Sequence, residues 1–391
     1  MFRSAVPIIF IITSLWASHV GAAVVRPPPL QRSTTPFDGQ YISTSADSTA
    51  VEWWYLQALA SDVEGDNPPA NVQILYYQGY PVSDGSTATQ SGEPEYYITI
   101  NGMFANGTVF NFNVPTSTGA ITTSGEAVSG KWGDAGEFAV PEDLSSMTAN
   151  VSAADYGIEA SISFVARTQR HFGCNATDDA YFDSAVSSSQ SLSTPESLFY
   201  KQLGWATTIP GGTADVTLTV NGTKLAFTGT AYHDANWLPA PLNEAVSSWY
   251  FLNAAVGPYD MSAVLVQPVN SSLKLNTGFL AKDGVVLQNQ CSVVGARNTD
   301  ISTATPTGSY IDSGLTLPTG FTLSYTLANG DVYSFDLTSQ GANPNQAIYH
   351  RWIGTATGWA CGWRTGDGHD SVRVVEPRCD AMTAPPLQKT P

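Results

Sequence analysis

The stretch Gly229-Thr230-Ala231-Tyr232-His233-Asp234-Ala235-Asn236-Trp237 places an imidazole, a carboxylate, a carboxamide and an indole within five residues. The chain is otherwise poor in such groups, because only 13% of its 391 residues are charged and it has five histidines. In a strand, alternate side chains point to opposite faces, so His233 would lie with Trp237, and Asp234 with Asn236. We expect one pair to reach a binding site and the other to hold the fold together.

A second stretch, Val51-Glu52-Trp53-Trp54-Tyr55, sets a carboxylate before three large aromatic residues. A carboxylate buried among indoles must be paired, hydrogen-bonded or protonated. Strand alternation also permits Glu52 to point to water while Trp53 and Tyr55 pack inside. We take Glu52, His233, Asp234 and Asn236 as candidate catalytic residues.

The composition indicates an all-β protein. Gly, Ser, Thr, Val and aromatic residues are plentiful while Lys and Glu are scarce. Residues 157–167 place Ile158, Ala160, Ile162 and Phe164 on one face, which is typical of a half-buried strand. A formal net charge of -17 argues against binding to nucleic acid or to anionic membranes, since both require clustered Lys and Arg.

The length of the chain favours two domains over one ordinary core. The segment Trp54-Tyr55-Leu56-Gln57-Ala58 is echoed 195 residues later by Trp249-Tyr250-Phe251-Leu252-Asn253-Ala254, which fits two related β-domains. Two prolines in Leu238-Pro239-Ala240-Pro241 interrupt strand pairing. We therefore expect an N-terminal domain over residues 24–238 and a C-terminal domain over residues 239–391. A short helix is expected within residues 195–203, where Glu196 and Lys201 suit its first and last turns.

The N-terminus predicts entry into the secretory pathway. Residues 1–23 have the order of a signal peptide, with one arginine, an apolar run and small residues at Gly21-Ala22-Ala23; the alternative is a buried N-terminal strand or an uncleaved anchor. No other stretch is long and apolar enough for a membrane span, so a secreted protein without an integral membrane segment is expected. Five N-glycosylation sequons agree with this: Asn106, Asn150, Asn175, Asn221 and Asn270. Asn221-Gly222 fits a hairpin turn equally well.

Four cysteines, an even number, predict two disulfides in an oxidising compartment, with three pairings possible. They are Cys174, Cys291, Cys361 and Cys379. They lack CxxC spacing, and the chain has no HExxH, GxSxG or Walker motif, so we expect no metal site and no nucleotide site. The tryptophans and tyrosines exceed what two small cores need, and they suit an apolar ligand pocket. The aromatic residues taken as substrate-binding are Trp53, Tyr55, Tyr77, Trp237, Trp249, Tyr250 and Trp352.

Together, the two quoted stretches resemble the paired signatures of the hydroxyneurosporene synthase-like, lipocalin-like proteins, which include carotenoid hydratases and fungal Diels-Alderases. The resemblance implies a two-domain all-β architecture, with a β-sandwich-like first half, a lipocalin-like β-barrel second half and a hydrophobic pocket. The carotenoid-type motif has a second His where Ala235 stands and a Gly where Leu238 stands, which weakens the case for hydration. The leader, sequons and cysteines instead resemble those of fungal hetero-Diels-Alderases.

This resemblance implies a cofactor-independent [4+2] cycloaddition on a hydrophobic polyketide or terpene intermediate. Aromatic walls would bring the reacting carbons together, and a hydrogen-bond donor would activate a conjugated carbonyl. Three alternatives stay open: an isoprenoid hydratase or isomerase, a secreted glycosidase that uses a Glu and an Asp, and a non-catalytic lipid carrier.

Overall fold

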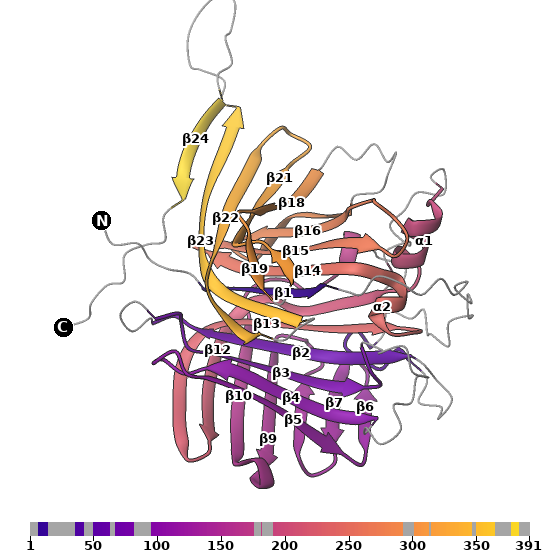
Figure 1. Ribbon diagram of the computed structural model, residues 1–391, viewed down its shortest axis with the longest axis vertical. Coiled ribbons are helices and arrows are strands. Elements are labelled where there is room, and N and C mark those ends of the chain that lie inside the picture. Colours follow the sequence, from indigo (N-terminus) through magenta and orange to yellow (C-terminus); the bar gives the residue numbers. More distant parts are fainter. Residues whose placement is uncertain are drawn as a thin grey trace, which may run out of the picture.

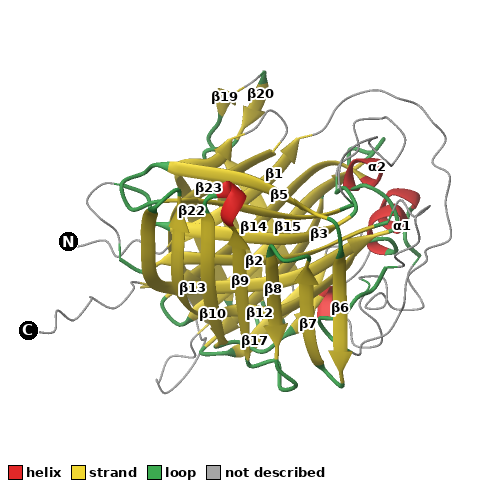
Figure 2. Ribbon diagram, turned by 90° about the horizontal axis from the view of Figure 1, so that it is seen from below, coloured by secondary structure: helices red, strands yellow, loops and turns green. Residues whose placement is uncertain are grey.

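Antiparallel strands make up most of the protein, which confirms the all-β prediction. The computed structural model describes residues 7–14, 36–42, 50–62, 67–81, 95–175, 181, 191–291, 301–312, 314–345, 349–363 and 377–382. Figure 1 shows two large sheets stacked on each other, and Figure 2 shows the strands of the first sheet crossing the molecule side by side. Within the described ranges, no helix is both long and apolar enough to cross a bilayer.

The first sheet has twelve strands, in the order β5-β4-β3-β2-β13-β12-β10-β9-β8-β7-β6, with β11 paired to β12. Residues from β4 and β8 share one apolar cluster and β4 contacts β7, so the sheet curls around this core. The strands are β2 (Val51–Ala60), β3 (Asn71–Gln78), β4 (Tyr96–Met103), β5 (Val109–Thr116), β6 (Gly119–Ser124), β7 (Ala127–Trp132), β8 (Gly136–Val140), β9 (Ser146–Ala153), β10 (Ile158–Ala166), β11 (His171–Phe172), β12 (Gly204–Val220) and β13 (Thr223–Leu238).

The second sheet has ten strands, in the order β17-β16-β15-β14-β1-β23-β22-β21-β18, with β24 paired to β23. It also curls, so that β18 lies beside β16 and β17. The strands are β1 (Pro7–Ser14), β14 (Val246–Val256), β15 (Tyr259–Pro268), β16 (Leu275–Lys282), β17 (Val285–Cys291), β18 (Ile301–Thr307), β21 (Gly320–Thr326), β22 (Val332–Asn345), β23 (Tyr349–Trp363) and β24 (Pro377–Met382), while β19 (Tyr310–Asp312) and β20 (Leu315–Leu317) pair separately.

The three largest apolar cores follow from strand alternation. In β10, every second residue from Ile158 to Phe164 is buried and the residues between them are exposed, as the sequence predicts. By contrast, β2 is buried at every position, because one of its faces lies inside the first sheet and the other meets the second sheet. The first core includes Trp54, Tyr76, Ile98, Trp132 and Phe138; the inter-sheet core includes Trp53, Tyr55, Trp205, Tyr232, Trp249 and Phe251; and the second core includes Leu252, Met261, Leu323, Phe335 and Trp352.

The chain passes from the first sheet to the second between Leu238, the last residue of β13, and Val246, the first of β14. The short helix α2 (Leu242–Ala245) lies in this crossing. Helix α1 (Thr194–Tyr200) confirms the helix expected within residues 195–203, and Glu196 closes a capping box with Ser193 at its start. The domain boundary at residue 238 stays a prediction, and the change of sheet occurs at the same place.

The segment Pro7–Ser14, which lies within the predicted leader, forms β1 between β14 and β23. Its pairing runs antiparallel to both neighbours, from Pro7 opposite Thr355 to Ser14 opposite Ser248. This placement matches the alternative of an N-terminal strand, while leader cleavage stays a prediction.

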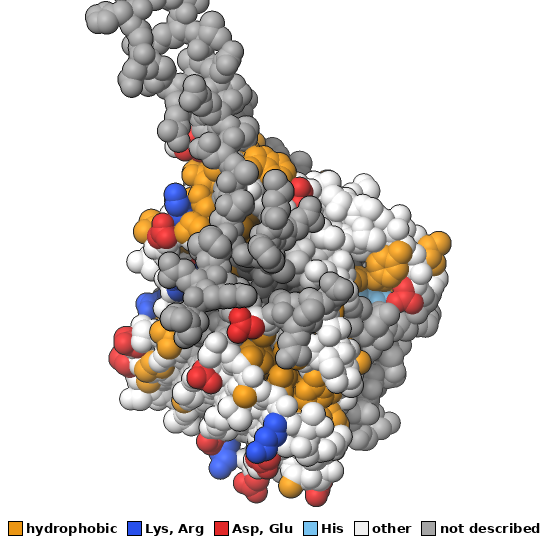
Figure 3. Space-filling model, turned by 90° about the vertical axis from the view of Figure 1, so that its left-hand side faces the viewer, with side chains coloured by type: hydrophobic (Ala, Val, Ile, Leu, Met, Phe, Trp, Pro, Cys, Tyr) orange, Lys and Arg blue, Asp and Glu red, His pale blue; other side chains and the backbone are white. Residues whose placement is uncertain are grey.

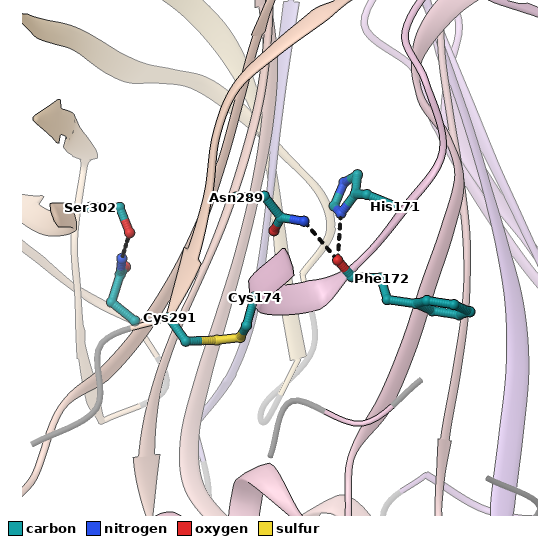
Figure 4. The surroundings of a disulfide bond; sticks show 7 residues. His171, Phe172, Cys174, Asn289, Cys291 and Ser302 are labelled. Carbon is teal, nitrogen blue, oxygen red and sulfur yellow. Dashed lines mark hydrogen bonds between the residues drawn. A yellow bond between two sulfur atoms is a disulfide. The ribbon is translucent and has the colours of Figure 1, made fainter. Parts of the chain in front are cut away.

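One disulfide, Cys174–Cys291, joins the two sheets (Figure 4). Cys174 lies in the turn after β11 and Cys291 ends β17, with their Cα atoms 4.8 Å apart. Nearby, the Asn289 side-chain amide donates to the Phe172 carbonyl at 2.8 Å, which adds a second link between these strands.

The sequons lie at the surface wherever their side chains are described. Asn106, Asn150, Asn221 and Asn270 are exposed, and the side chain of Asn175 lies outside the described residues. Asn221 and Gly222 form the β12–β13 turn with positive φ angles of 49° and 79°, which confirms the hairpin. Glycosylation stays a prediction. On the face in Figure 3, charged side chains are scattered among uncharged ones.

Candidate functional site

Strands β2 and β13 bring the two quoted stretches side by side. They pair antiparallel, with Tyr55 opposite Asp234 and Trp53 opposite Asn236. On its other edge β13 pairs with β12, whose register shifts between Thr207 and Gly212, whereas β13 keeps strict alternation beside β2. The motif side chains are therefore divided between two faces, and each face meets a different core.

On the inner face, His233 holds a short segment, residues 36–42, inside the first sheet. His233 Nε2 lies 2.9 Å from Asp38 Oδ2, and its Nδ1 donates to the Tyr55 carbonyl at 2.9 Å, since a carbonyl can only accept. Both His233 and Asp38 are fully buried. Burial alone would lower the pKa of His233, but the charge and hydrogen bond of Asp38 outweigh it, so the pKa is raised.

Glu52 and Trp237 hold the same segment. The Glu52 carboxylate accepts hydrogen bonds from the backbone N–H of Tyr41, at 3.0 Å, and of Ile42, at 3.3 Å. Burial raises the pKa of Glu52 well above its usual range, although these N–H groups oppose the rise. Trp237 stacks on Tyr41 with ring centroids 3.8 Å apart, and its indole donates to the Tyr181 hydroxyl at 3.0 Å. Glu52, His233 and Trp237 therefore face away from the inter-sheet core.

On the outer face, aromatic residues from both sheets surround Asp234 and Asn236. Trp53, Tyr55 and Tyr232 come from β2 and β13, and the second sheet contributes Trp249 and Phe251 of β14. Several aromatic rings pack together here. Between ring centroids, Trp205 of β12 lies 5.9 Å from Trp249 and 5.6 Å from Phe251. Tyr232 lies 5.2 Å from Phe251, and Phe199 of α1 lies 6.0 Å from Trp249.

Asp234 is the one carboxyl group of this face that belongs to the quoted motif. The Tyr232 hydroxyl donates to its Oδ2 at 2.6 Å. Its Oδ1 and the Nδ2 of Asn236 are buried and make no hydrogen bond of normal geometry within the described residues, although Trp205 and Asn236 lie close enough to Asp234 to lower its pKa. Burial raises the pKa of Asp234 to about 7, while Tyr232, His233, Trp205 and Asn236 oppose the rise. Near neutral pH this carboxyl group is therefore divided between its acid and its anion.

Polar residues continue beside Tyr55 along the same face. The Tyr55 hydroxyl donates to Gln57 Oε1 at 2.8 Å, and the Gln57 amide donates to Asn253 Oδ1 of the second sheet at 3.3 Å. Arg351 of β23 reaches across from the second sheet and is fully buried. Its guanidinium donates to Gln73 Oε1 at 3.0 Å and to Asn101, and lies 5.6 Å from the Tyr55 ring centroid. A buried cation thus lies on the aromatic wall of the site.

The structure sorts the expected site residues into three places. Trp53, Tyr55, Tyr77, Trp249, Asp234 and Asn236 share the inter-sheet face, where Tyr77 is partly buried and packs against the core. Glu52, His233 and Trp237 lie in the first sheet and bind residues 36–42. Tyr250 and Trp352 pack with the second core, where Trp352 donates to the Tyr310 hydroxyl at 2.7 Å and Tyr250 meets Phe321.

Sequence reasoning missed several residues of the site. Tyr232 alternates with Asp234 in the first quoted stretch, and Phe251 alternates with Trp249 in the repeat, so both could have been identified. Trp205 lies in neither stretch and reaches the site because β12 pairs it with Asn236. Asp38 and Arg351 carry no local signal, because only pairing across the fold brings them to His233 and Tyr55. In the described ranges, no three His, Cys, Asp or Glu side chains are grouped to hold a metal ion.

A family model described as Diels-Alderase-like matches residues 25–342. The quinolone epoxide rearrangement protein penF of Penicillium thymicola is 25% identical over 321 residues, which cover 80% of this chain and 81% of that protein. The quinolone epoxide rearrangement protein asqO of Emericella nidulans is 22% identical over 306 residues, which cover 78% and 77%.

Solved structures share the fold. CghA with Sch210972 superposes with a TM-score of 0.57 at 20% identity, covering 90% of this chain and 96% of CghA. A putative AttH from Nitrosomonas europaea gives a TM-score of 0.52 at 14% identity, covering 94% and 100%. The resemblance expected from the two quoted stretches is thereby confirmed. Since the family model spans most of its length, the chain belongs to the Diels-Alderase-like family.

Proposed function

We propose that the inter-sheet face around Asp234 and Asn236 is the active site of a secondary-metabolite cyclase that catalyses a [4+2] cycloaddition on a hydrophobic polyketide or terpenoid intermediate. One observation carries the proposal. Two buried polar atoms, Asp234 Oδ1 and Asn236 Nδ2, make no hydrogen bond of normal geometry within the described residues, and aromatic rings pack around them. Buried polar atoms are nearly always hydrogen-bonded, so a pair of this kind fits a site that completes its bonds with a ligand.

The chemistry requires only shape and a donor. Trp53, Trp205 and Trp249 supply flat apolar walls that would hold a diene and a dienophile at about 3–3.5 Å, which is the main contribution to such a reaction. The acid form of Asp234, fixed by the Tyr232 hydroxyl, would donate to the carbonyl conjugated with the dienophile. The Asn236 amide would donate to the same oxygen, and the two bonds together would stabilise the charge that develops there.

A second candidate is rearrangement of an epoxide, which the names of the two related quinolone epoxide rearrangement proteins favour. The same residues would serve, because an acid with a pKa of about 7 can protonate an epoxide oxygen near neutral pH. The two reactions differ in their demand on Asp234: cycloaddition requires a hydrogen bond, and epoxide opening requires transfer of the proton.

The glycosidase alternative fits the geometry poorly. Its two carboxyl groups must flank one glycosidic bond. Glu52 and Asp234 instead lie on opposite faces of paired strands, with Glu52 bound to the N–H groups of Tyr41 and Ile42. The non-catalytic carrier is tested by experiment below, since an aromatic pocket suffices for binding without catalysis.

The test compares Asp234→Asn with Asp234→Ala on two probes, a linear triene bearing a terminal conjugated ketone and an aryl epoxide of similar size. The amide of Asp234→Asn still donates a hydrogen bond but cannot transfer a proton. For cycloaddition we expect Asp234→Asn to keep much of the turnover and Asp234→Ala to lose about 10²-fold. If only the epoxide is converted, and both variants lose its turnover equally, rearrangement would be favoured.

Tyr250→Phe is the matched control, because Tyr250 packs with the second core. Binding is followed by quenching of tryptophan fluorescence, since three indoles line the site. Binding without product in the wild-type protein, on either probe, would contradict catalysis and favour a carrier.

A further inference from the structure

Two cysteines that are distant from the proposed site lie opposite each other in neighbouring strands. Cys361 is in β23 and Cys379 is in β24, and the antiparallel register pairs these two positions directly. Strand β24 lies on the same edge of β23 as β1 but further along, since β1 pairs with residues up to Thr355 and β24 with residues from Gly358. Strand β24 thus covers the part of this edge of β23 that β1 leaves free (Figure 1).

The backbone spacing of such a pair suits a disulfide. Directly opposed residues in antiparallel strands have Cα atoms about 4.5 or 5.5 Å apart, depending on the hydrogen-bonding pattern. Disulfides usually join Cα atoms about 4.4–6.8 Å apart. Both kinds of antiparallel position therefore satisfy the geometric requirement without movement of the backbone.

The other two cysteines are already joined to each other. Cys174–Cys291 links the two sheets, so the three pairings that the sequence leaves open reduce to one. The partner of Cys361 in that one pairing is Cys379, the residue that the register independently places opposite it.

We propose that Cys361 and Cys379 form a second disulfide, which fastens the C-terminal strand β24 to β23. The two thiols lose two protons and two electrons, and a protein disulfide oxidant accepts them by thiol–disulfide exchange. Strand β24 covers the part of the β23 edge that β1 does not reach, and the bond would hold it there. An unpaired edge would otherwise be open to other strands. This inference does not depend on the proposed function.

The test maps the disulfides of the full-length protein, expressed with its own N-terminus into the secretory pathway. Free thiols are first blocked with iodoacetamide under denaturing, non-reducing conditions. Trypsin cleaves after Arg351, Arg364, Arg378 and Lys389, so the bond would link peptide 352–364 to peptide 379–389. We expect mass spectrometry to find this linked pair, two hydrogens lighter than the separate peptides combined. Alkylated Cys361 and Cys379, or either residue linked to Cys174 or Cys291, would overturn the proposal.

Variants then show what the bond does. In the Cys361→Ser/Cys379→Ser double variant we expect faster amide exchange across residues 377–382 and unchanged exchange in β17. The Cys174→Ser/Cys291→Ser variant is the matched control, and it should show the reverse pattern. Unchanged exchange of residues 377–382 in the first variant would contradict the fastening role, while the peptide map of the wild-type protein tests the bond itself.

Discussion

Glu52 and Asp234 are both buried carboxyl groups with raised pKa values, yet their surroundings assign them different roles. Glu52 accepts from two backbone N–H groups of residues 36–42, whereas Asp234 lies among the aromatic rings between the sheets. We predict that Glu52→Gln lowers the free energy of unfolding by about 1–3 kcal/mol, because an amide nitrogen would then face an N–H group. Its kcat at 25 °C should match that of the wild type.

Urea denaturation and initial-rate measurements on the same preparation check this prediction. If Glu52→Gln loses turnover as Asp234→Ala does, while its unfolding midpoint stays unchanged, Glu52 acts in the chemistry and its assigned role is wrong.

At the scale of elements, residues 36–42 lie inside the first sheet and connect two of its strands, β2 and β13. Asp38 in this segment pairs with His233 of β13, and its carbonyl accepts from the Trp54 indole of β2 at 3.2 Å. We predict that Asp38→Asn destabilises the protein by about 3–5 kcal/mol, because it leaves the raised-pKa imidazole without its buried countercharge. The Asp38→Asn/His233→Gln double variant should recover part of this loss.

A double-mutant cycle built from urea denaturation measures the coupling between the two residues. Additive effects of the two substitutions would show that the pair does not hold the segment to the strands.

The same elements show what could be read from the sequence. The half-buried strand β10 and the β12–β13 hairpin were predictable, since one has alternating polarity and the other an Asn-Gly turn. Alternation also predicted that His233 and Asp234 face opposite ways. Which face meets the ligand was not predictable, because β2 is buried on both faces and carries no contrast between polar and apolar positions.

The internal repeat was difficult to interpret for the same reason. Trp54 lies in the first core but Trp249 lies in the inter-sheet core, so the spacing of 195 residues compares side chains from different faces.

At the scale of the whole molecule, buried titratable groups predict a stability that falls as pH rises above 6.5. Asp234, with a pKa of about 7, keeps a proton in the folded state that the unfolded chain releases near pH 4, and the raised pKa of Glu52 has the same sign. His233, whose pKa is raised above 6.5, loses its stabilising charge as pH rises through its folded value. His171 has the opposite sign: burial lowers its pKa to about 4, so its contribution grows from pH 4 and is complete above 6.5.

As the pH rises above 6.5, each of these four groups therefore either lowers the free energy of unfolding or leaves it unchanged. Urea unfolding at pH 6.5 and 8, at constant ionic strength, should give a lower free energy of unfolding at pH 8, and Asp234→Asn should reduce the difference. A higher stability at pH 8 would contradict these protonation states.

Cleavage of the predicted leader would change the second sheet, because the leader contains β1. Removal of residues 1–23, as the leader-like sequence predicts, deletes β1 and with it the pairing partner of both β14 and β23. These strands carry Trp249, Phe251 and Arg351 of the proposed site, so the change reaches the inter-sheet face. We predict faster amide exchange in residues 246–256 and 349–355 of a chain beginning at residue 24 than in the full chain. The first sheet, with whose strands β1 does not pair, serves as the internal control. Equal exchange in both forms would show that β14 and β23 find other partners.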